Sequence, residues 1–148
     1  MLTSGRIKAI SISKKKGCKK KNVRTAILKK GLGMVGDAHA GSERQISLLA
    51  EESIKRIRDK GLDVRSGDFA ENITTSGIDL KGLKIGDRLK IGKNALLEIT
   101  QIGKTCHNRC NIYYEAGDCV MPKEGLFARV LKGGQIRLED KMEIECIK

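Results

Sequence analysis

The chain has 148 residues, with 30 Lys and Arg against 18 Asp and Glu, and its formal net charge is +12. A chain of this length can bury a core of its own without disulfide or metal staples. No stretch approaches the ~18 apolar residues of a membrane span, and residues 1–10 lack the apolar run and cleavage site of a signal peptide. We therefore expect one soluble domain over residues 1–148 in the cytoplasm, and exclude membrane, secreted and disordered classes.

The excess of basic residues is concentrated at the N-terminus. Residues 1–30 contain eleven Lys and Arg and no acid, and six of them lie in the segment Lys14–Lys21. The alternating runs Arg6–Ile12 and Asn22–Leu28 predict the two strands of a hairpin, with this segment as its turn. Three interpretations of the segment stay open: a solvated turn, a surface that steers an anion, or a contact with nucleic acid. The last is disfavoured because the chain has no Trp and only two Phe and two Tyr for base stacking.

The middle of the chain predicts one clear helix among strands. A glycine-rich loop, Gly31–Gly41, precedes a short strand at Gln45–Leu49. We expect a helix at Ala50–Lys60, because acidic residues come first, basic residues come last and Gly61 follows. Many short strands with few helices indicate a mostly β, α+β fold, either a barrel or a sandwich. Runs of suitable residues predict further strands at Phe69–Thr74, Arg88–Ile91, Ala95–Gln101 and Gln135–Ile147, and short helices at Cys106–Ala116 and Glu124–Leu131.

The strongest candidate for chemistry is the thiol of Cys106, directly after an apolar strand. Lys104 and Arg109, with His107 adjacent, favour the thiolate, which is the form that attacks, carries sulfur or binds a metal. The chain has five cysteines, and an odd number in a reducing compartment indicates free thiols or metal ligands rather than a disulfide framework.

The cysteines that follow leave further alternatives open. Cys110 and Cys119, together with Cys106 and His107, could hold zinc or an iron–sulfur cluster, although their spacing matches no common metal motif. Cys110 or Cys119 could instead resolve a persulfide or disulfide formed at Cys106. A purely structural role is an equal alternative for Cys110 and for Cys119.

The glycine-rich loop contains a second pair of polar residues, Asp37 and His39. The loop has no Gly-Lys-Ser/Thr ending, so it is not a nucleotide-binding P-loop. Two interpretations stay open: a structural hydrogen-bonded pair, or a backbone that exposes N–H groups to an anion.

Several segments, in order along the chain, carry a resemblance to a known family. Together they resemble the MOSC domain, which is named for the C-terminal part of molybdenum cofactor sulfurases. The resemblance implies a mostly β fold, a closed or partly open barrel with a few short helices, and residues 106–122 resemble its small stand-alone branch. The segments are Gly36–Gly41, Arg44–Leu49, Glu71–Gly77, Ile85–Asp87, and Glu98–Lys104 followed by Cys106.

The resemblance also implies work on the molybdenum cofactor, with Cys106 as the signature cysteine. Cys106 would be either a catalytic residue that carries persulfide sulfur or a ligand of the molybdenum, since molybdenum accepts soft thiolate ligands. Two features depart from the family pattern: Thr105 stands where many members have Pro, and Cys110 and Cys119 are additional. Residues expected to bind the phosphate and pterin of the cofactor are Arg44, Asn72, Lys104, Arg129, Arg109 and His39.

The expected partners follow from the same resemblance. A cysteine desulfurase would load sulfur onto Cys106, or a molybdoenzyme would receive the cofactor, and this chain is expected to hold no pyridoxal phosphate. Two other classes of protein remain as alternatives: a basic β-barrel that binds nucleic acid through Lys14–Lys21, and a structural zinc or iron–sulfur domain. The oligomeric state stays open.

Overall fold

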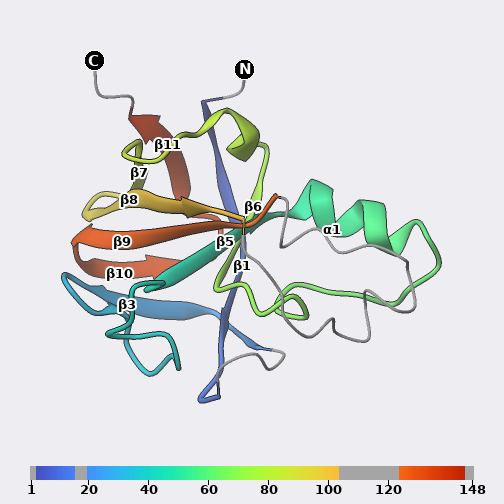
Figure 1. The fold of residues 1–148 in the computed structure, drawn as a ribbon, viewed down its shortest axis with the longest axis horizontal. Helices are drawn as coiled ribbons and strands as arrows, with labels where there is room; N and C mark the ends of the chain where they lie inside the picture. The colour runs from blue at the N-terminus through green and yellow to red at the C-terminus, as the bar shows by residue number, and fades with distance from the viewer. Residues whose placement is uncertain (1–2, 16–19, 104–123, 146–148) are drawn as a thin grey trace.

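The structure is a computed structural model that describes residues 3–15, 20–103 and 124–145 (Figure 1). Residues 104–123, which we name the cysteine segment, lie outside this description, as do residues 1–2, 16–19 and 146–148. The described chain is mostly β, with one short α-helix, α1 (Glu51–Arg58), and one turn of 3-10 helix, η1 (Leu80–Gly82). Its strands are β1 (Ser4–Ile12), β2 (Lys21–Val23), β3 (Thr25–Lys29), β4 (Gly33–Met34), β5 (Ile46–Ala50), β6 (Ile73–Ser76), β7 (Arg88–Ile91), β8 (Ala95–Ile102), β9 (Leu126–Lys132), β10 (Gly134–Arg137) and β11 (Lys141–Glu145).

Seven of these strands close into a barrel. Their order is β11-β7-β8-β9-β5-β6-β1, and β1 pairs with β11 to complete the ring. The last residues of β1 pair with β2, which extends the sheet beyond the ring. The neighbours β5 and β6 run parallel, and a parallel pair needs a crossover connection, which α1 and the loop after it provide. The predicted barrel is therefore confirmed, and the sandwich alternative is excluded.

Alternate residues of the barrel strands point inward, except where a bulge in β1 places Ile7 and Ile10 three residues apart in the interior. In β9, Leu126, Ala128 and Val130 belong to the interior cluster, whereas Phe127 belongs to a second cluster outside the ring. This alternation follows from the pleat, which directs successive side chains to opposite faces of a sheet. Fully buried members of the interior cluster include Ile7, Ile10, Leu48, Ile73, Leu89 and Leu97.

The helix α1 covers part of the outer face of the barrel through this second cluster, which we name the outer core. Two isoleucines of the helix pack there against one residue of β5, one of β9 and two from the loop after the helix. Acidic residues occupy the first turn of α1 and basic residues the last, as the macrodipole favours. The predicted helix is confirmed, although it is shorter at both ends than Ala50–Lys60. The buried residues of the outer core are Leu49, Ile54, Ile57, Val64, Phe69 and Phe127.

A second sheet, with the order β10-β3-β4, packs against the barrel. Ala26 and Leu28 of β3, Met34 of β4 and Ile136 of β10 all belong to the interior cluster. One face of this small sheet is therefore buried, and its other face is exposed. In the described residues no helix is long and apolar enough to cross a membrane.

Several sequence predictions agree with the strands observed, and some are wrong. The strands predicted at Arg6–Ile12, Gln45–Leu49, Arg88–Ile91 and Ala95–Gln101 correspond to β1, β5, β7 and β8. The strand predicted at Asn22–Leu28 is two strands, because β2 pairs with β1 while β3 leaves the barrel to pair with β10.

The helix predicted at Glu124–Leu131 is wrong, because this segment forms most of β9. Its composition suits a helix, but its apolar residues at every second position face the barrel interior, and pairing with β5 and β8 supplies its backbone hydrogen bonds. The strand predicted at Phe69–Thr74 begins only at Ile73 in β6. The one predicted at Gln135–Ile147 is broken into β10 and β11 by a turn with Glu139 at a φ of 71°. The helix predicted at Cys106–Ala116 lies outside the described residues.

We expect Leu97→Ala to destabilise the protein by about 2–5 kcal/mol, because it leaves a cavity in the closed barrel. Leu97 of β8 is fully buried, whereas Ile85, in an exposed turn, is 67% accessible. The matched control Ile85→Ala should change the free energy of unfolding by less than ~0.5 kcal/mol. Urea unfolding followed by circular dichroism measures both. Equal losses for the two variants would contradict the closed interior described above.

Candidate functional site

The carboxylate of Asp37 organises the glycine-rich loop. It accepts hydrogen bonds from the backbone N–H of Ser13 at 3.1 Å, from Lys20 Nζ at 2.7 Å and from the backbone N–H of His39 at 3.1 Å. Burial alone would raise the pKa of Asp37, but the hydrogen bonds from His39, Lys20 and Ser13 outweigh it and hold the pKa far below its usual value. Asp37 is therefore an ionised carboxylate that ties this loop to the end of β1.

Lys20 corrects an expectation about the lysine-rich segment. The sequence placed it in a turn with its neighbours, yet its side chain is only 1% exposed, whereas Lys14 and Lys15 are exposed. Its ammonium pairs with Asp37, and its backbone N–H donates to Gly67 O at 2.8 Å. A buried ammonium requires such a partner, because an isolated charge is costly to remove from water. Lys20 therefore fastens the start of β2 to the glycine-rich loop and to the loop after α1.

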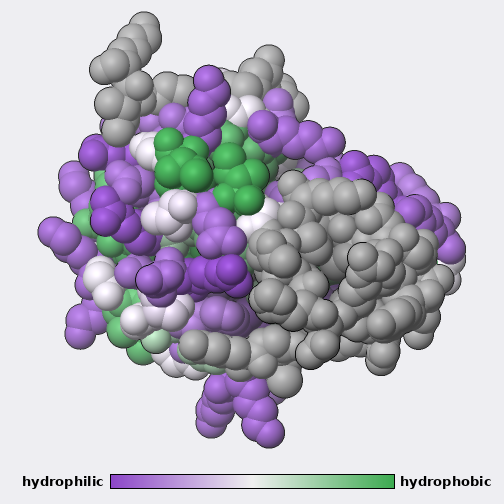
Figure 2. All heavy atoms as spheres, in the orientation of Figure 1, coloured by the Kyte–Doolittle hydropathy of each residue, from purple (hydrophilic) through white to green (hydrophobic). Residues whose placement is uncertain are grey.

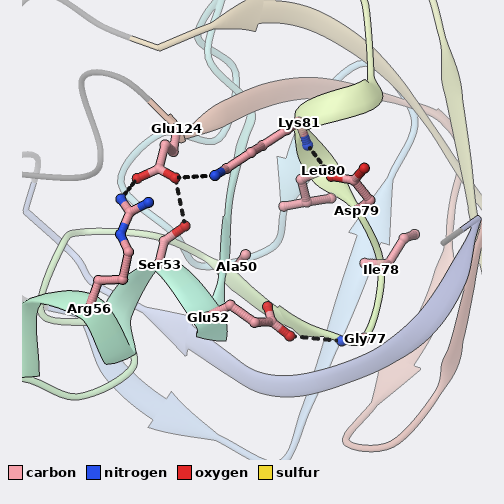
Figure 3. Close-up of a pocket in the computed structure, with 10 residues that line it drawn as sticks. All are labelled: Ala50, Glu52, Ser53, Arg56, Gly77, Ile78, Asp79, Leu80, Lys81 and Glu124. Carbon is pink, nitrogen blue, oxygen red and sulfur yellow. Dashed lines mark hydrogen bonds and ion pairs between the residues drawn. The ribbon is translucent and has the colours of Figure 1, made fainter. Parts of the chain in front are cut away.

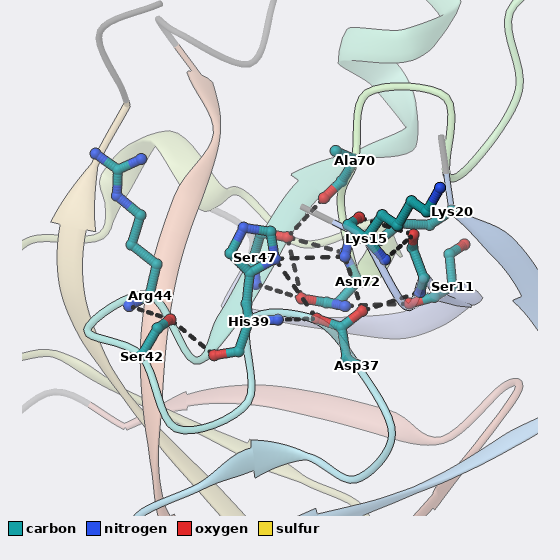
Figure 4. A network of polar contacts seen from close by, with 11 residues as sticks. Ser11, Lys15, Lys20, Asp37, His39, Ser42, Arg44, Ser47, Ala70 and Asn72 are labelled. Carbon is teal, nitrogen blue, oxygen red and sulfur yellow. Dashed lines mark hydrogen bonds and ion pairs between the residues drawn. The ribbon is translucent and has the colours of Figure 1, made fainter. Parts of the chain in front are cut away.

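The same network continues from Asp37 to Arg44 (Figure 4). The Ser42 hydroxyl donates to His39 O at 2.7 Å and accepts from the backbone N–H of Arg44 at 3.1 Å. His39 Nδ1 lies 3.5 Å from Lys20 Nζ. The buried ion pair, His39 and Arg44 are thus parts of one hydrogen-bonded loop.

The side chain of Arg44 is tethered to the strand end from which the cysteine segment continues. Arg44 Nε donates to Gln101 Oε1 at 3.2 Å, and the guanidinium carbon lies 5.2 Å from the centre of the Phe127 ring. Gln101 Nε2 in turn donates to Gly103 O at 2.8 Å. Within the described residues no acid pairs with Arg44, and Figure 4 shows its guanidinium pointing away from the glycine-rich loop. Its two terminal amines therefore form no ion pair with any acid that the structure describes.

Asn72 joins three strands rather than facing solvent. Its side-chain amide donates to Ser11 O at 3.1 Å, and its oxygen accepts from the backbone N–H of Ser47 at 3.0 Å and from the Ser47 hydroxyl at 3.2 Å. Asn72 is fully buried, so its amide has no exposed edge to offer a pterin. In this structure it holds β1, β5 and β6 in register beneath the glycine-rich loop.

The described residues on either side of the cysteine segment, Gly103 and Gly125, lie next to each other, and we name this pair the root of the segment. The backbone N–H of Gly103 donates to Gly125 O at 2.6 Å. The Glu124 carboxylate is held between Arg56 of α1 and Lys81 of η1 (Figure 3), with Lys81 Nζ at 3.3 Å. A cavity of about 450 Å³ lies between α1 and the chain that leads into η1, with Glu124 in its wall.

The thiols and two of the predicted cations lie outside the described residues. These are Cys106, Lys104 and Arg109, together with the alternative metal ligands Cys110 and Cys119. In the part of the chain that the structure describes, no three His, Asp or Glu side chains are grouped so as to hold a metal ion. The last described residue before the cysteine segment, Gly103, directly follows β8, and Gln101 of β8 binds Arg44.

Comparison with known proteins decides the family. The model of the MOSC domain matches residues 35–143, from the glycine-rich loop to β11. The chain belongs to the MOSC domain family. Comparison with curated proteins gave no match.

Solved structures share the MOSC fold of this chain. YuaD from Bacillus subtilis aligns with a TM-score of 0.81 and 19% identity, covering 98% of this chain and 97% of that one. YiiM from Escherichia coli gives a TM-score of 0.66 at 19% identity, over 97% of this chain and 71% of that one. YiiM from Geobacillus stearothermophilus gives 0.65 at 20% identity, over 98% and 74%. At these identities the likeness establishes the fold.

Arg129 of the MOSC barrel already forms an ion pair with Glu98. Its Nε and Nη2 lie 2.8 and 2.6 Å from Glu98 Oε1, across the pairing of β8 with β9. Arg129 and Phe127 project from the same outer face of β9, and Phe127 is the residue on which Arg44 packs. An anion would have to compete with Glu98 for it, which ranks Arg129 below Arg44 as a phosphate ligand.

Sequence reasoning did not single out Glu71, which precedes Asn72. Its buried carboxyl accepts hydrogen bonds from the backbone N–H groups of Gly67 at 2.8 Å and Phe69 at 3.3 Å, and from the Thr74 hydroxyl at 3.0 Å. Burial outweighs these bonds and raises the pKa of Glu71 to about 7. An acidic residue directly before the buried Asn72 was the only signal in the sequence.

Lys20→Met should lower the free energy of unfolding by about 3–5 kcal/mol, because it leaves the Asp37 carboxylate buried without its counter-charge. The control Lys55→Met breaks the exposed pair of Lys55 with Asp59, whose side chains are 68% and 63% exposed, and should cost less than ~0.5 kcal/mol. Chemical denaturation measures both variants. A small loss for Lys20→Met would show that the ammonium is not buried.

Glu71→Gln should change how stability depends on pH. The pKa of Glu71 is about 7 in the folded protein against an ordinary value of 4.5, so the folded state binds the extra proton between these values. This contribution to stability is fully present below pH 4.5 and is lost as the pH rises through 7. The neutral variant lacks this loss and should be the more stable protein at alkaline pH. Urea unfolding at a series of pH values measures the free energy of unfolding of both proteins. Parallel curves of this free energy against pH would contradict the assignment.

Proposed function

We propose that this MOSC domain binds the molybdenum cofactor or a precursor of it on the outer face of the barrel, beside the root of the cysteine segment. Arg44 holds the phosphate of the cofactor, and Cys106 presents the thiolate that carries sulfur to it or ligates its molybdenum. The observation that carries the proposal is the tether from Arg44 through Gln101 to Gly103, which holds a guanidinium without an ion pair in the described residues beside the residue that precedes the cysteine segment.

The residues on this face suit a phosphate-bearing ligand. A guanidinium presents parallel N–H groups that match two phosphate oxygens, and it stays charged at every physiological pH. The contacts of Arg44 with Gln101 and Phe127 restrict its rotation, so less conformational freedom is lost when an anion binds. The overall charge of +12 further attracts an anionic ligand.

His39 adds a hydrogen-bond donor on the same loop. His39 Nδ1 faces the buried ion pair, at 3.5 Å from Lys20 Nζ and 3.6 Å from Asp37 Oδ2. The His39 side chain is 20% exposed, and we propose that its other ring nitrogen, Nε2, donates a hydrogen bond to an oxygen of the ligand.

Cys106 supplies the chemistry in this proposal. Lys104 and Arg109 stabilise its thiolate, which is the reactive form of cysteine. As a carrier, the thiolate attacks the outer sulfur of a persulfide on a donor protein, and the donor leaves as a thiolate. As a ligand, the same thiolate donates to molybdenum. Cys110 and Cys119 are available in the same segment to resolve a sulfur-loaded Cys106.

Arg44→Ala should weaken binding of the molybdenum cofactor about 10–100-fold, as expected for loss of a hydrogen bond between charged groups. Native mass spectrometry with isolated cofactor measures the bound fraction. Arg129→Ala is the matched control, because the Arg129 guanidinium is paired with Glu98, and this variant should retain most of the affinity.

The Cys106→Ala variant, incubated with a cysteine desulfurase and cysteine, should not gain the mass of a sulfur atom. Unchanged cofactor binding in Arg44→Ala and unchanged sulfur gain in Cys106→Ala would together overturn the proposal.

A further inference from the structure

The exposed face of the small sheet combines unpaired positive charge with apolar side chains. We name it the basic face and define it by Arg24, Ile27, Lys29, Val35 and Arg137. Ile27 is 56% exposed and Val35 is 44% exposed, although both are large aliphatic residues. Figure 2 shows apolar side chains among hydrophilic ones at the lower left, over the region where Figure 1 draws β3.

Strand pairing places these residues next to one another. Ala26 and Leu28 of β3 point into the barrel, so Ile27 and Lys29 point outward. Ile27 lies opposite Gln135 of β10, and the backbone N–H of Val35 donates to Ile27 O at 2.9 Å. Val35, Ile27 and Gln135 therefore form a row across the sheet.

Basic residues flank this row on both sides. Lys29 follows Ile27 on the same face of β3, and Arg137 lies opposite Thr25 at the other end of the strand. The strands of this sheet contain no Asp or Glu. Within the described residues, none of Arg24, Lys29 and Arg137 forms an ion pair, and Asp140 accepts instead from the backbone N–H of Arg137. No acid in the described residues therefore forms an ion pair with a basic residue of this face.

The chemistry of the face fits a protein surface better than a nucleic acid. An apolar centre surrounded by charges is the usual anatomy of a protein interface, and complementary charge selects the partner. Single-stranded nucleic acid needs aromatic side chains for base stacking. The aromatic residues in the described part of the chain, Phe69 and Phe127, are both buried in the outer core.

We propose that the basic face docks an acidic surface of the protein that delivers sulfur to Cys106. The proposal rests on the carrier form of the proposed function. Persulfide exchange joins two thiols, so the donor protein must be held while its cysteine reaches Cys106. The Cys106 thiolate then bonds to the outer sulfur, the S–S bond of the donor breaks, and the donor leaves as a thiolate. The proton of the persulfide stays with the transferred sulfur, and no net oxidation occurs.

The first test measures docking by itself. The probe is the cysteine desulfurase of the same organism, and binding is measured on Cys106→Ala protein to separate docking from sulfur transfer. Lys29→Glu combined with Arg137→Glu should weaken binding at least tenfold. The matched control, Lys84→Glu combined with Lys93→Glu, makes the same change in net charge at two exposed lysines elsewhere and should bind within twofold of the parent.

Three results of this binding test would overturn the proposal. The first is that the parent protein does not bind the desulfurase, and the second is that both double variants lose the same affinity for it. The third is that the parent binds a short single-stranded oligonucleotide, and that Lys29→Glu/Arg137→Glu abolishes this binding but leaves desulfurase binding unchanged. Circular dichroism verifies that both double variants are folded. Ile27→Ser, which leaves the charge unchanged, should also weaken desulfurase binding if the apolar row lies at the centre of the interface.

The second test separates failure of docking from failure of the proposed function. Sulfur gain at Cys106 is followed by mass spectrometry with the desulfurase and cysteine, and in parallel with sodium polysulfide, which needs no docking surface. Lys29→Glu/Arg137→Glu should slow loading by the desulfurase at least tenfold and leave loading by polysulfide unchanged. Equal slowing with both donors would overturn docking, whereas absence of loading with either donor in the parent protein would overturn the carrier function itself.

Discussion

The ion pair between Lys20 and Asp37 is the interaction on which the organisation of the site depends. Both side chains are removed from solvent, so each requires the other to offset the cost of burying a charge. Through Asp37 the pair fixes the turn after β1 and the glycine-rich loop, and through the contact with His39 it fixes the direction of that ring. The loop then delivers Arg44 to the outer face of the barrel.

The closed barrel explains why the polar residues gather on its outer face. Its interior is filled by apolar side chains, and the polar groups of the site described above lie at strand ends and in loops. The crossover between the parallel strands β5 and β6 adds α1 and the outer core beside that face. Arg44 packs on Phe127 at the edge of this core, where it meets the root of the cysteine segment. The small sheet leaves a separate exposed face for a partner.

Local patterns in the sequence predicted most of the strands, the helix and the family. They failed where pairing with distant strands decided the outcome. The segment Glu124–Leu131 has a helix-like composition, yet its alternate apolar residues fill the barrel between β5 and β8. Asn72 was expected from the family resemblance to bind the pterin, whereas in the structure its amide forms hydrogen bonds with Ser47 of β5 and Ser11 of β1. The roles of Lys104, Arg109 and Cys106 stay predictions.

The sequence by itself determined the mostly β class, the helix α1 and the order of motifs that indicates the MOSC family, because these depend on spacing along the chain. Only the tertiary structure decided which charged groups are solvated and which are buried. Lys20 and its neighbouring lysines are alike in sequence, but Lys20 alone meets the Asp37 carboxylate inside the protein among the lysines of that segment that the structure describes. Arg44 and Arg129 are likewise the same residue type. The fold gives Arg129 a carboxylate partner across the β8–β9 pairing and directs Arg44 to the root of the cysteine segment.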